Sequence, residues 1–144
     1  MTDRLHGKIK KGWGYELIWA STDKYCGKIL VFEKAEAKFS MHFHKEKEES
    51  WFVNDGQFKV LWIDTTTAQL LQKDLVAGST WHNPPLQPHQ VVCIEPGSIT
   101  EVSTADSVED NYRVIPGDSQ TIEKDTGTNP TISDTTSQTT AKVT

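Results

Sequence analysis

Short segments rich in β-branched and aromatic residues recur along the chain about every ten residues, with turn-forming residues between them. No long stretch shows the hydrophobic period of about 3.6 residues that marks an amphipathic helix. This pattern predicts an all-β fold, either a sandwich or a barrel of short strands. We expect strands at residues 13–20, 25–32, 38–44, 49–54, 57–63, 68–73, 79–82, 89–94 and 99–104.

Two polar segments between these strands have the residues of tight turns. Residues 54–56 (Asn-Asp-Gly) are typical of a hairpin, because a tight hairpin turn needs positive φ angles. Residues 95–98 (Glu-Pro-Gly-Ser) predict a second turn, in which Pro presets φ and Gly tolerates the left-handed conformation. We expect a charged loop at residues 45–49 and an irregular closing segment at residues 106–120.

The end of the chain differs in composition from the rest. All aromatic residues lie between Trp13 and Tyr112, whereas residues 121–144 contain many threonines and few apolar side chains. Such a segment cannot bury enough surface to offset the entropy lost on ordering. We therefore expect an N-terminal arm at residues 1–12, one β-barrel domain at residues 13–120 and a flexible Thr-rich tail at residues 121–144.

The composition argues against several classes of partner. The net charge is −5 and Lys and Arg form no sustained stripe, so nucleic acid is not expected as the main partner. No apolar run approaches the ~20 residues that span a bilayer, so no membrane partner is expected. The basic start of the chain lacks the apolar stretch of a secretory signal. Cys26 and Cys93 are too few for a disulfide framework; we expect buried thiols in a cytoplasmic protein.

The residues with the clearest chemical meaning are three histidines and a group of carboxylates. His42 and His44 lie two residues apart on an expected strand, so their side chains share one face and can reach the same metal ion. A carboxylate from the charged segment that follows can turn back toward them. His89 opens a later apolar strand and can project into the same interior. Three neutral imidazoles and one carboxylate suit Fe, Mn, Ni, Co or Zn.

These residues resemble the first motif of the cupin superfamily, Gly-x5-His-x-His-x3–4-Glu-x6-Gly. After His42 and His44, Glu49 follows at the motif spacing of four intervening residues, and Gly56 follows after six more. Of the nearby carboxylates, the resemblance therefore implies Glu49 as the ligand. The leading Gly of the motif is replaced by Glu36, which affects a turn rather than a ligand.

The second cupin motif, Gly-x5-Pro-x-Gly-x2-His-x3-Asn, is matched at Gly78, Pro84 and His89. Leu86 stands in place of its second Gly and Cys93 in place of its Asn. The resemblance implies a jelly-roll β-barrel that holds one divalent transition metal in its interior. The implied ligands are His42, His44, Glu49 and His89.

A closer resemblance is to the type II mannose-6-phosphate isomerase branch of the cupins. Residues 13–16 (Trp-Gly-Tyr-Glu) and 49–51 (Glu-Ser-Trp) look like segments of that branch. Residues 101–104 (Glu-Val-Ser-Thr) and 109–113 (Glu-Asp-Asn-Tyr-Arg) are similar to its closing part. The final Asp-x-Tyr-Gly-Arg of the branch is absent, and residues 115–118 (Ile-Pro-Gly-Asp) stand there instead.

This resemblance implies a sugar or sugar-phosphate isomerase of carbohydrate metabolism. The metal would polarise a sugar carbonyl and hydroxyl while a carboxylate moves a proton between adjacent carbons. We expect Glu101 to carry that proton and Arg113 to bind an anionic group of the substrate. Trp51 and Trp62 are expected to contact the sugar by stacking, and Lys47 by its charge.

Two other functions fit the same residues. One is a metal-dependent lyase or Fe(II) dioxygenase acting on a small organic acid, because the same ligand set supports such chemistry elsewhere in the superfamily. The other is a sugar-binding cupin without catalytic activity. Dimers are common among small cupins, so the resemblance also allows a homodimer in which the N-terminal strand pairs with a partner.

Overall fold

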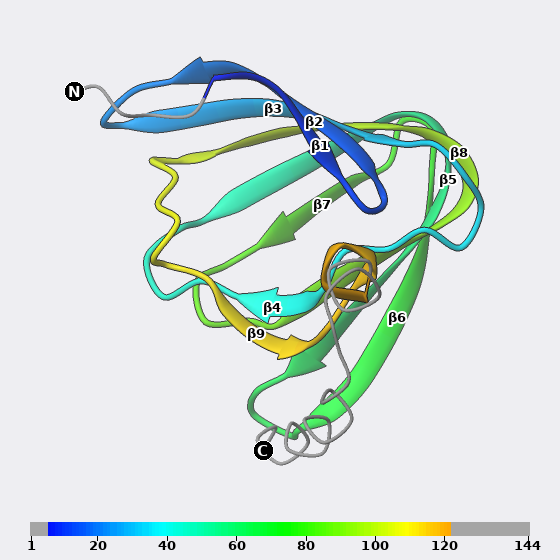
Figure 1. Ribbon diagram of the computed structural model, residues 1–144. Coiled ribbons are helices and arrows are strands. Elements are labelled where there is room, and N and C mark those ends of the chain that lie inside the picture. Colours follow the sequence, from blue (N-terminus) through cyan, green and yellow to red (C-terminus); the bar gives the residue numbers. More distant parts are fainter. Residues whose placement is uncertain (1–5, 122–144) are drawn as a thin grey trace, which may run out of the picture.

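The strands of this chain form one antiparallel sheet that curls over on itself (Figure 1). The computed structural model describes residues 6–121. The strands are β1 (Gly7–Lys11), β2 (Gly14–Ser21), β3 (Tyr25–Phe32), β4 (Met41–Phe43), β5 (Glu49–Asp64), β6 (Gln69–Val76), β7 (Thr80–Asn83), β8 (His89–Thr104) and β9 (Tyr112–Ile115). The all-β jelly-roll prediction is therefore confirmed.

The two longest strands, β5 and β8, pair along their length and bend together, which divides the sheet into two halves. In the half that we call the β1 half, the order is β1-β2-β3-β8-β5-β7. In the other, the β9 half, the order is β6-β5-β8-β4-β9. Figure 1 shows the two halves facing each other, joined where β5 and β8 curve.

The bend in β5 and β8 lies at the two segments for which the sequence predicts turns, and both turn predictions are wrong. Strand β5 continues through residues 54–56 and β8 continues through residues 95–98, with register shifts between the paired strands. Gly56 has a φ of 85°, and a Cβ added to Gly97 would collide with the backbone of Asp55. The glycines therefore allow two strands to approach closely at a bulged corner instead of reversing the chain.

Most of the other predicted strands are confirmed, with differences at their ends. The strand expected at residues 25–32 coincides with β3, whereas the one expected at 38–44 is limited to β4. The irregular closing segment expected at residues 106–120 is wrong in part, because it contains β9. Strand β9 pairs with the short strand β4, and this contact between distant segments leaves no local signal in the sequence.

The core lies between the two halves and is rich in aromatic side chains. The Trp13 and Phe32 rings stack with their centroids 4.6 Å apart, and Phe58 meets Phe32 edge-on. Trp51 is fully buried beside them. Cys26 and Cys93 are buried free thiols in the described structure, as the sequence predicts.

The ends of the chain relate differently to this core. Residues 7–11 of the expected N-terminal arm form β1, which pairs with β2 at the edge of the sheet. The expected tail falls almost entirely on residues 122–144, which lie outside the described residues. Within residues 6–121, no helix has the length and apolar character needed to cross a membrane.

Candidate metal centre

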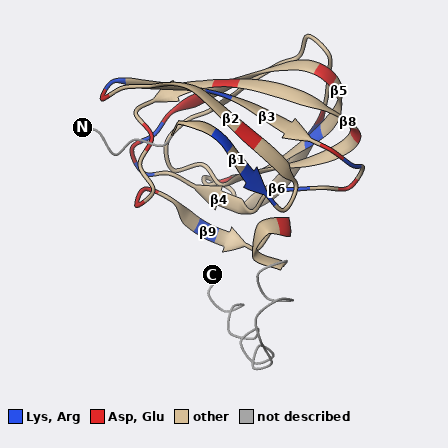
Figure 2. Ribbon diagram, turned by 45° about the horizontal axis from the view of Figure 1, so that its top comes forward, with Lys and Arg blue, Asp and Glu red and all other residues tan. Residues whose placement is uncertain are grey.

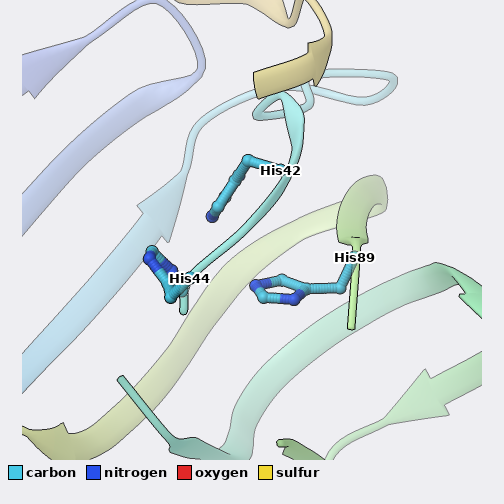
Figure 3. A group of neighbouring side chains, drawn as sticks. All are labelled: His42, His44 and His89. Atoms are coloured by element: carbon cyan, nitrogen blue, oxygen red, sulfur yellow. The ribbon is translucent and has the colours of Figure 1, made fainter. Parts of the chain in front are cut away.

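Three histidines from two strand segments meet on the inner side of the β9 half. His42 lies on β4 and pairs directly with His89 at the start of β8, while His44 immediately follows β4. The ring centroids are 4.8 Å apart for His42 and His89, and 5.0 Å apart for His42 and His44. One nitrogen from each ring lies within 4.8 Å of the others, and Figure 3 shows the rings converging. The predicted grouping of these histidines is thus present.

Backbone carbonyl groups set the orientation of all three rings. The Nδ1 atoms lie 2.9 Å from the Ser40 oxygen for His42, 2.6 Å from the Asp110 oxygen for His44 and 2.9 Å from the Gln87 oxygen for His89. A carbonyl oxygen only accepts hydrogen bonds, so each Nδ1 carries the proton and donates it. In the neutral ring, Nε2 then has a free lone pair, which is the form in which imidazole binds metals.

Burial favours the same uncharged state. It lowers the pKa of His42 well below 6.5, and the neighbouring His89 and His44 lower it further. Burial also lowers the pKa of His44, although Glu49 opposes this shift. Both rings are therefore neutral at pH 7, as a metal site requires.

Glu49, the first residue of β5, lies beside two of the three histidines. Its Oε2 atom is 2.9 Å from His89 Nε2, and its Oε1 atom is 3.8 Å from His44 Nε2. Asn83 donates a hydrogen bond to Oε2 over 3.1 Å. Burial alone would raise the pKa of Glu49, but the His89 ring and the Lys47 ammonium lower it well below its usual range.

The contact between His89 and Glu49 provides a test of whether a cation fits here. Although the two atoms are close, His89 Nε2 is fully buried and has no hydrogen-bond partner among the described residues. In the neutral form of the ring, the Nε2 lone pair faces a carboxylate, and the two repel each other unless a positive charge lies between them. A divalent transition metal bound by the histidines and Glu49 supplies that charge, so the donor set fits the predicted metal.

Asp110 supports this centre in a way that the sequence does not reveal. Its carboxylate accepts hydrogen bonds from the backbone N–H groups of Lys45, Glu46 and Lys47, at 2.6, 3.0 and 3.0 Å. Its own carbonyl oxygen accepts the Nδ1 proton of His44. Burial alone would raise the pKa of the Asp110 carboxyl group, but these hydrogen bonds together lower it. Asp110 thus fixes the loop after β4 and one ring of the centre together.

The histidines adjoin a cavity of about 220 Å³ between the two halves of the sheet. Five charged residues also line it, and we call them the charged wall: Glu16, Lys28, Lys47, Glu101 and Asp106. Acidic and basic segments are interspersed over the whole molecule as well (Figure 2). The size of the cavity suits a small metabolite, since drug-sized ligands occupy about 300–1,000 Å³.

Lys47 is the centre of the charged wall. Its Nζ atom lies 3.4 Å from Glu49 Oε1, 3.2 Å from Glu101 Oε2 and 3.0 Å from Asp106 Oδ1. Burial alone would lower its pKa, but these carboxylates raise it well above its ordinary value, with Glu101 first among them. Lys47 therefore links the carboxylate of the candidate metal centre to the rest of the wall.

Glu101 lies on β8 and is buried beneath the same cavity. Trp51 Nε1 donates a hydrogen bond to its Oε1 atom over 3.3 Å, while Oε2 has no hydrogen-bond partner among the described residues, although Lys47 is within ion-pair distance. Burial raises the pKa of Glu101, as does the nearby Glu49, while Lys47 and Lys28 oppose them. This carboxyl group can therefore exchange a proton closer to neutral pH than an ordinary glutamate can.

Lys28 and Asp106 complete the wall. Lys28 Nζ lies 3.4 Å from Glu16 and 3.2 Å from Asp106. Burial alone would raise the pKa of Asp106, but Lys47 and then Lys28 lower it to about 2. Neither residue was predicted as functional, although a charged Lys28 at an inward position of an otherwise apolar strand is a signal that strand alternation could have revealed.

The remaining predicted site residues lie at different distances from this cavity. Arg113, on β9, lines the cavity at an exposed position and forms no ion pair within the described part of the chain. Trp51 reaches the site through its hydrogen bond to Glu101 and packs against His89, with ring centroids 5.7 Å apart. Trp62 packs against Trp81 instead, and it is not among the residues that line this cavity.

Comparisons with known proteins identify the fold. No protein-family model matches the sequence, and no curated protein matches it. KdgF from a Halomonas species is similar in structure, with 19% identity and a TM-score of 0.61 over 72% of this chain and 90% of that one. An RmlC-like cupin from Shewanella frigidimarina has 18% identity and a TM-score of 0.61 over 76% of this chain and 92% of its own.

A third similar structure belongs to a longer protein. Oxalate decarboxylase from Bacillus subtilis has 20% identity and a TM-score of 0.63 over 75% of this chain. The match spans only 29% of the oxalate decarboxylase chain. The shared feature in all three comparisons is the curled antiparallel sheet, and this chain therefore has the jelly-roll fold of the cupins.

Proposed function

We propose that this chain is a metal-dependent isomerase acting on a small sugar or sugar phosphate. The observation that carries the proposal is the convergence of nitrogens from three histidines, two of them beside Glu49, next to a cavity that is also lined by the buried carboxyl group of Glu101. When bound, a divalent metal acts as a Lewis acid on a carbonyl oxygen and an adjacent hydroxyl oxygen. His42, His44, His89 and Glu49 would hold it.

Glu101 supplies the second requirement of an isomerisation, a group that moves a proton between adjacent carbons. It would take the proton from one carbon and return it to the next, so that no co-reactant is needed. Its raised pKa brings it nearer to the pH at which such a transfer is efficient. Trp51 orients the carboxyl group through Oε1 and leaves Oε2 directed to Lys47 and the cavity.

The position of Arg113 favours a substrate that carries an anionic group. Every lysine of the charged wall is already paired with carboxylates, whereas the Arg113 guanidinium has no ion pair among the described residues. A guanidinium binds phosphate or carboxylate through two parallel hydrogen bonds. We propose that Arg113 binds the phosphate or another anionic group of the substrate at the exposed side of the cavity.

A second candidate is a metal-dependent lyase, decarboxylase or oxygenase of a small organic acid. The favouring observations are the small cavity and the likeness to oxalate decarboxylase, of which solved structures describe Mn(II) centres and a formate complex. In that case Arg113 would bind a substrate carboxylate and Glu101 would deliver or remove a proton. A sugar-binding protein without turnover is a third outcome.

A substrate panel separates these candidates. The metal-loaded full chain is incubated without oxygen with hexose and pentose phosphates, free sugars and small organic acids. We expect interconversion of an aldose and a ketose, with exchange of the transferred hydrogen with solvent. Glu101→Gln should lower the rate by about 10²–10⁴-fold. His44→Ala should abolish turnover, and the exposed His82→Ala serves as the matched control.

Each other result selects a different function. Release of carbon dioxide from an organic acid without oxygen would replace the isomerase with a decarboxylase, and oxygen uptake with Fe(II) would replace it with an oxygenase. Saturable sugar binding without turnover would leave a binding protein. If Glu101→Gln retains full activity, Glu101 is not the proton carrier.

A further inference from the structure

Four large apolar side chains line the cavity beside the histidines, and they differ in how far they are open. Trp13 and Leu30 are only 4% and 3% exposed, so the core covers nearly all of their surface. Val108 is 79% exposed, so solvent covers most of it. Phe39 is intermediate, because it packs against the core and is still partly open. It is therefore the apolar side chain best placed to contact a molecule inside the cavity.

The Phe39 ring lies next to the candidate metal centre. Its centroid is 5.3 Å from that of the His42 ring and 6.5 Å from that of the His89 ring. The Trp13 and Trp51 rings are nearly perpendicular to it, each with its centroid 6.0 Å away. The ring thus contacts both the core and the histidines. A molecule in the cavity that reaches the histidines lies beside this ring.

The backbone around Phe39 is held from several directions. Gln90 Nε2 donates a hydrogen bond to the Phe39 carbonyl oxygen over 2.8 Å. The Lys38 N–H group donates to Asp118 Oδ2 over 2.9 Å, and the Asp118 N–H group donates to the Lys38 carbonyl oxygen over 3.0 Å. Gly117 packs so closely that a Cβ atom there would lie 2.4 Å from the Phe39 carbonyl carbon. The ring is therefore positioned in advance, and a site of this kind loses less entropy when a ligand binds.

Most of the other groups that line the cavity are polar or charged. Small-molecule sites combine apolar and aromatic side chains with a few polar groups that fix the orientation of the ligand. Here the histidines, Glu49 and the charged wall supply the polar groups. Trp51 and Trp62, the aromatic residues that the sequence predicts to contact a sugar, are not among the residues that line the cavity. The carbon skeleton of a ligand beside the histidines therefore meets Phe39.

We propose that Phe39 is a specificity-determining residue, whose ring packs against the carbon skeleton of the substrate next to the histidines. This inference rests on the proposed function, because it assumes that the histidines hold a metal and that the substrate binds there. The ring favours a substrate with C–H groups on one side of its skeleton and polar groups on the other. It disfavours a substrate with a charge on the side of the ring, because that charge would lose water without gaining a partner.

Two hydroxamates test this contact without any turnover. Acetohydroxamate and butyrohydroxamate carry the same metal-binding group, and the second has two more methylene groups. Titration calorimetry measures the dissociation constant of each for the full chain loaded with Zn(II). A methylene group buried against an apolar surface strengthens binding about fourfold. We therefore expect butyrohydroxamate to bind the unmodified chain about 10-fold more tightly than acetohydroxamate.

Variants of Phe39 show whether this preference comes from its ring. Phe39→Gln replaces the ring with a polar side chain and should reduce the preference to less than about 3-fold, with the affinity for Zn(II) unchanged. Phe39→Leu keeps an apolar side chain and should retain most of the preference. Phe43→Gln is the matched control, because Phe43 is also partly buried but stacks on the Tyr112 ring and does not line the cavity. It should bind both hydroxamates like the unmodified chain.

A second measurement uses the unmodified chain, so it does not depend on the folding of Phe39→Gln. Nuclear Overhauser effects should connect the methylene protons of butyrohydroxamate to the Phe39 ring in the Zn(II)-loaded protein. Their absence, or an equal preference in Phe39→Gln and the unmodified chain, would overturn the inference and leave the isomerase proposal intact. The expected preference without turnover of any sugar would overturn the isomerase alone. A chain that binds no Zn(II) would overturn both.

Discussion

Two of the three histidines, His42 and His44, line the same cavity as the charged wall, but the histidines and the wall are held in different ways. Each of the three rings donates its Nδ1 proton to a backbone carbonyl group. The wall consists of acidic and basic side chains joined by ion pairs, with Lys47 in contact with three carboxylates.

This difference explains why only one of the two regions is arranged for a metal. The histidines keep free lone pairs because the backbone satisfies their other nitrogen, so a cation meets ligands that need no rearrangement. The carboxylates of the wall already have lysine partners, and a cation would have to displace them. The wall is therefore suited to position charge and transfer protons, and it depends on each of its members for stability.

The largest expected effect is on the stability of the wall. Lys47→Met removes one buried charge and leaves Glu101 and Asp106 without its compensation, which should lower the free energy of unfolding by about 3–5 kcal/mol. Chemical denaturation of the metal-free chain measures this. Lys45→Met is the control, because the Lys45 side chain is exposed and lies over the Tyr112 ring; it should change stability by less than about 1 kcal/mol.

A double variant sharpens that prediction. Glu101→Gln combined with Lys47→Met removes one charge of each sign, so the pair should lose less stability than the sum of the single variants. The cycle measures the coupling between the two side chains directly. Additive losses would mean that Lys47 and Glu101 act independently, contrary to their 3.2 Å ion pair.

The next largest effect is on metal affinity, with little change in the fold. His44→Ala removes a ligand and should weaken metal binding by more than the ~100-fold that loss of a supporting hydrogen bond can cost. Titration calorimetry with Mn(II) and Zn(II) measures it. His82→Ala should bind the metals like the unmodified chain, because His82 pairs with Glu48 on the surface.

Asp110 connects the histidines to the protein backbone, and its loss should have an intermediate effect. Asp110→Ala frees three backbone N–H groups and loosens the carbonyl group that holds His44, so metal affinity should fall by about 10–100-fold. The neighbouring Glu109→Ala is the matched control. Equal affinities for the two variants would show that the position of His44 does not depend on the Asp110 carboxylate.

The smallest expected effect is on the pH dependence of stability, because the histidines and the charged wall lose stability in different pH ranges. The pKa of His42 is lowered from 6.5, so the unfolded chain binds a proton first and the metal-free protein loses stability as the pH falls below 6.5. This loss is at most ~1.4 kcal/mol per pH unit for each histidine. For Asp106, with its pKa lowered from 3.8 to about 2, the loss begins only below pH 3.8.

Denaturation of variants at several pH values measures these two ranges. His42→Gln should flatten the decline in stability between pH 6.5 and 5, whereas Asp106→Asn should leave the slope there unchanged. Because the pKa of Glu101 is raised, its contribution to stability increases as the pH falls. This contribution is the same in both variants, so it cancels when their slopes are compared. An unchanged slope in His42→Gln would contradict a lowered pKa for this ring.

Strand alternation predicted the meeting of His42 and His44, since two positions on one strand share a face whatever the tertiary structure. The place of His89 at the start of an apolar strand made it a candidate, whereas the choice of Glu49 among the nearby carboxylates needed the spacing of the cupin motif. The bend at Gly56 and Gly97 could not be predicted, because glycine suits a hairpin and a bulge equally well, as the positive φ of Gly56 illustrates, and the partner strand decides between them. Asp110 and Asp106 act across distant loops, so no local pattern marks them.

Metal titration of the chelator-treated and dialysed full chain tests the central claim most directly. At pH 7, the unmodified chain should bind one divalent transition metal ion per chain, and variants lacking His42, His44 or His89 should lose that binding while remaining folded. A folded unmodified chain that binds no such metal at neutral pH, or a variant that retains full affinity without one of these histidines, would contradict the assignment of the three rings as a metal centre.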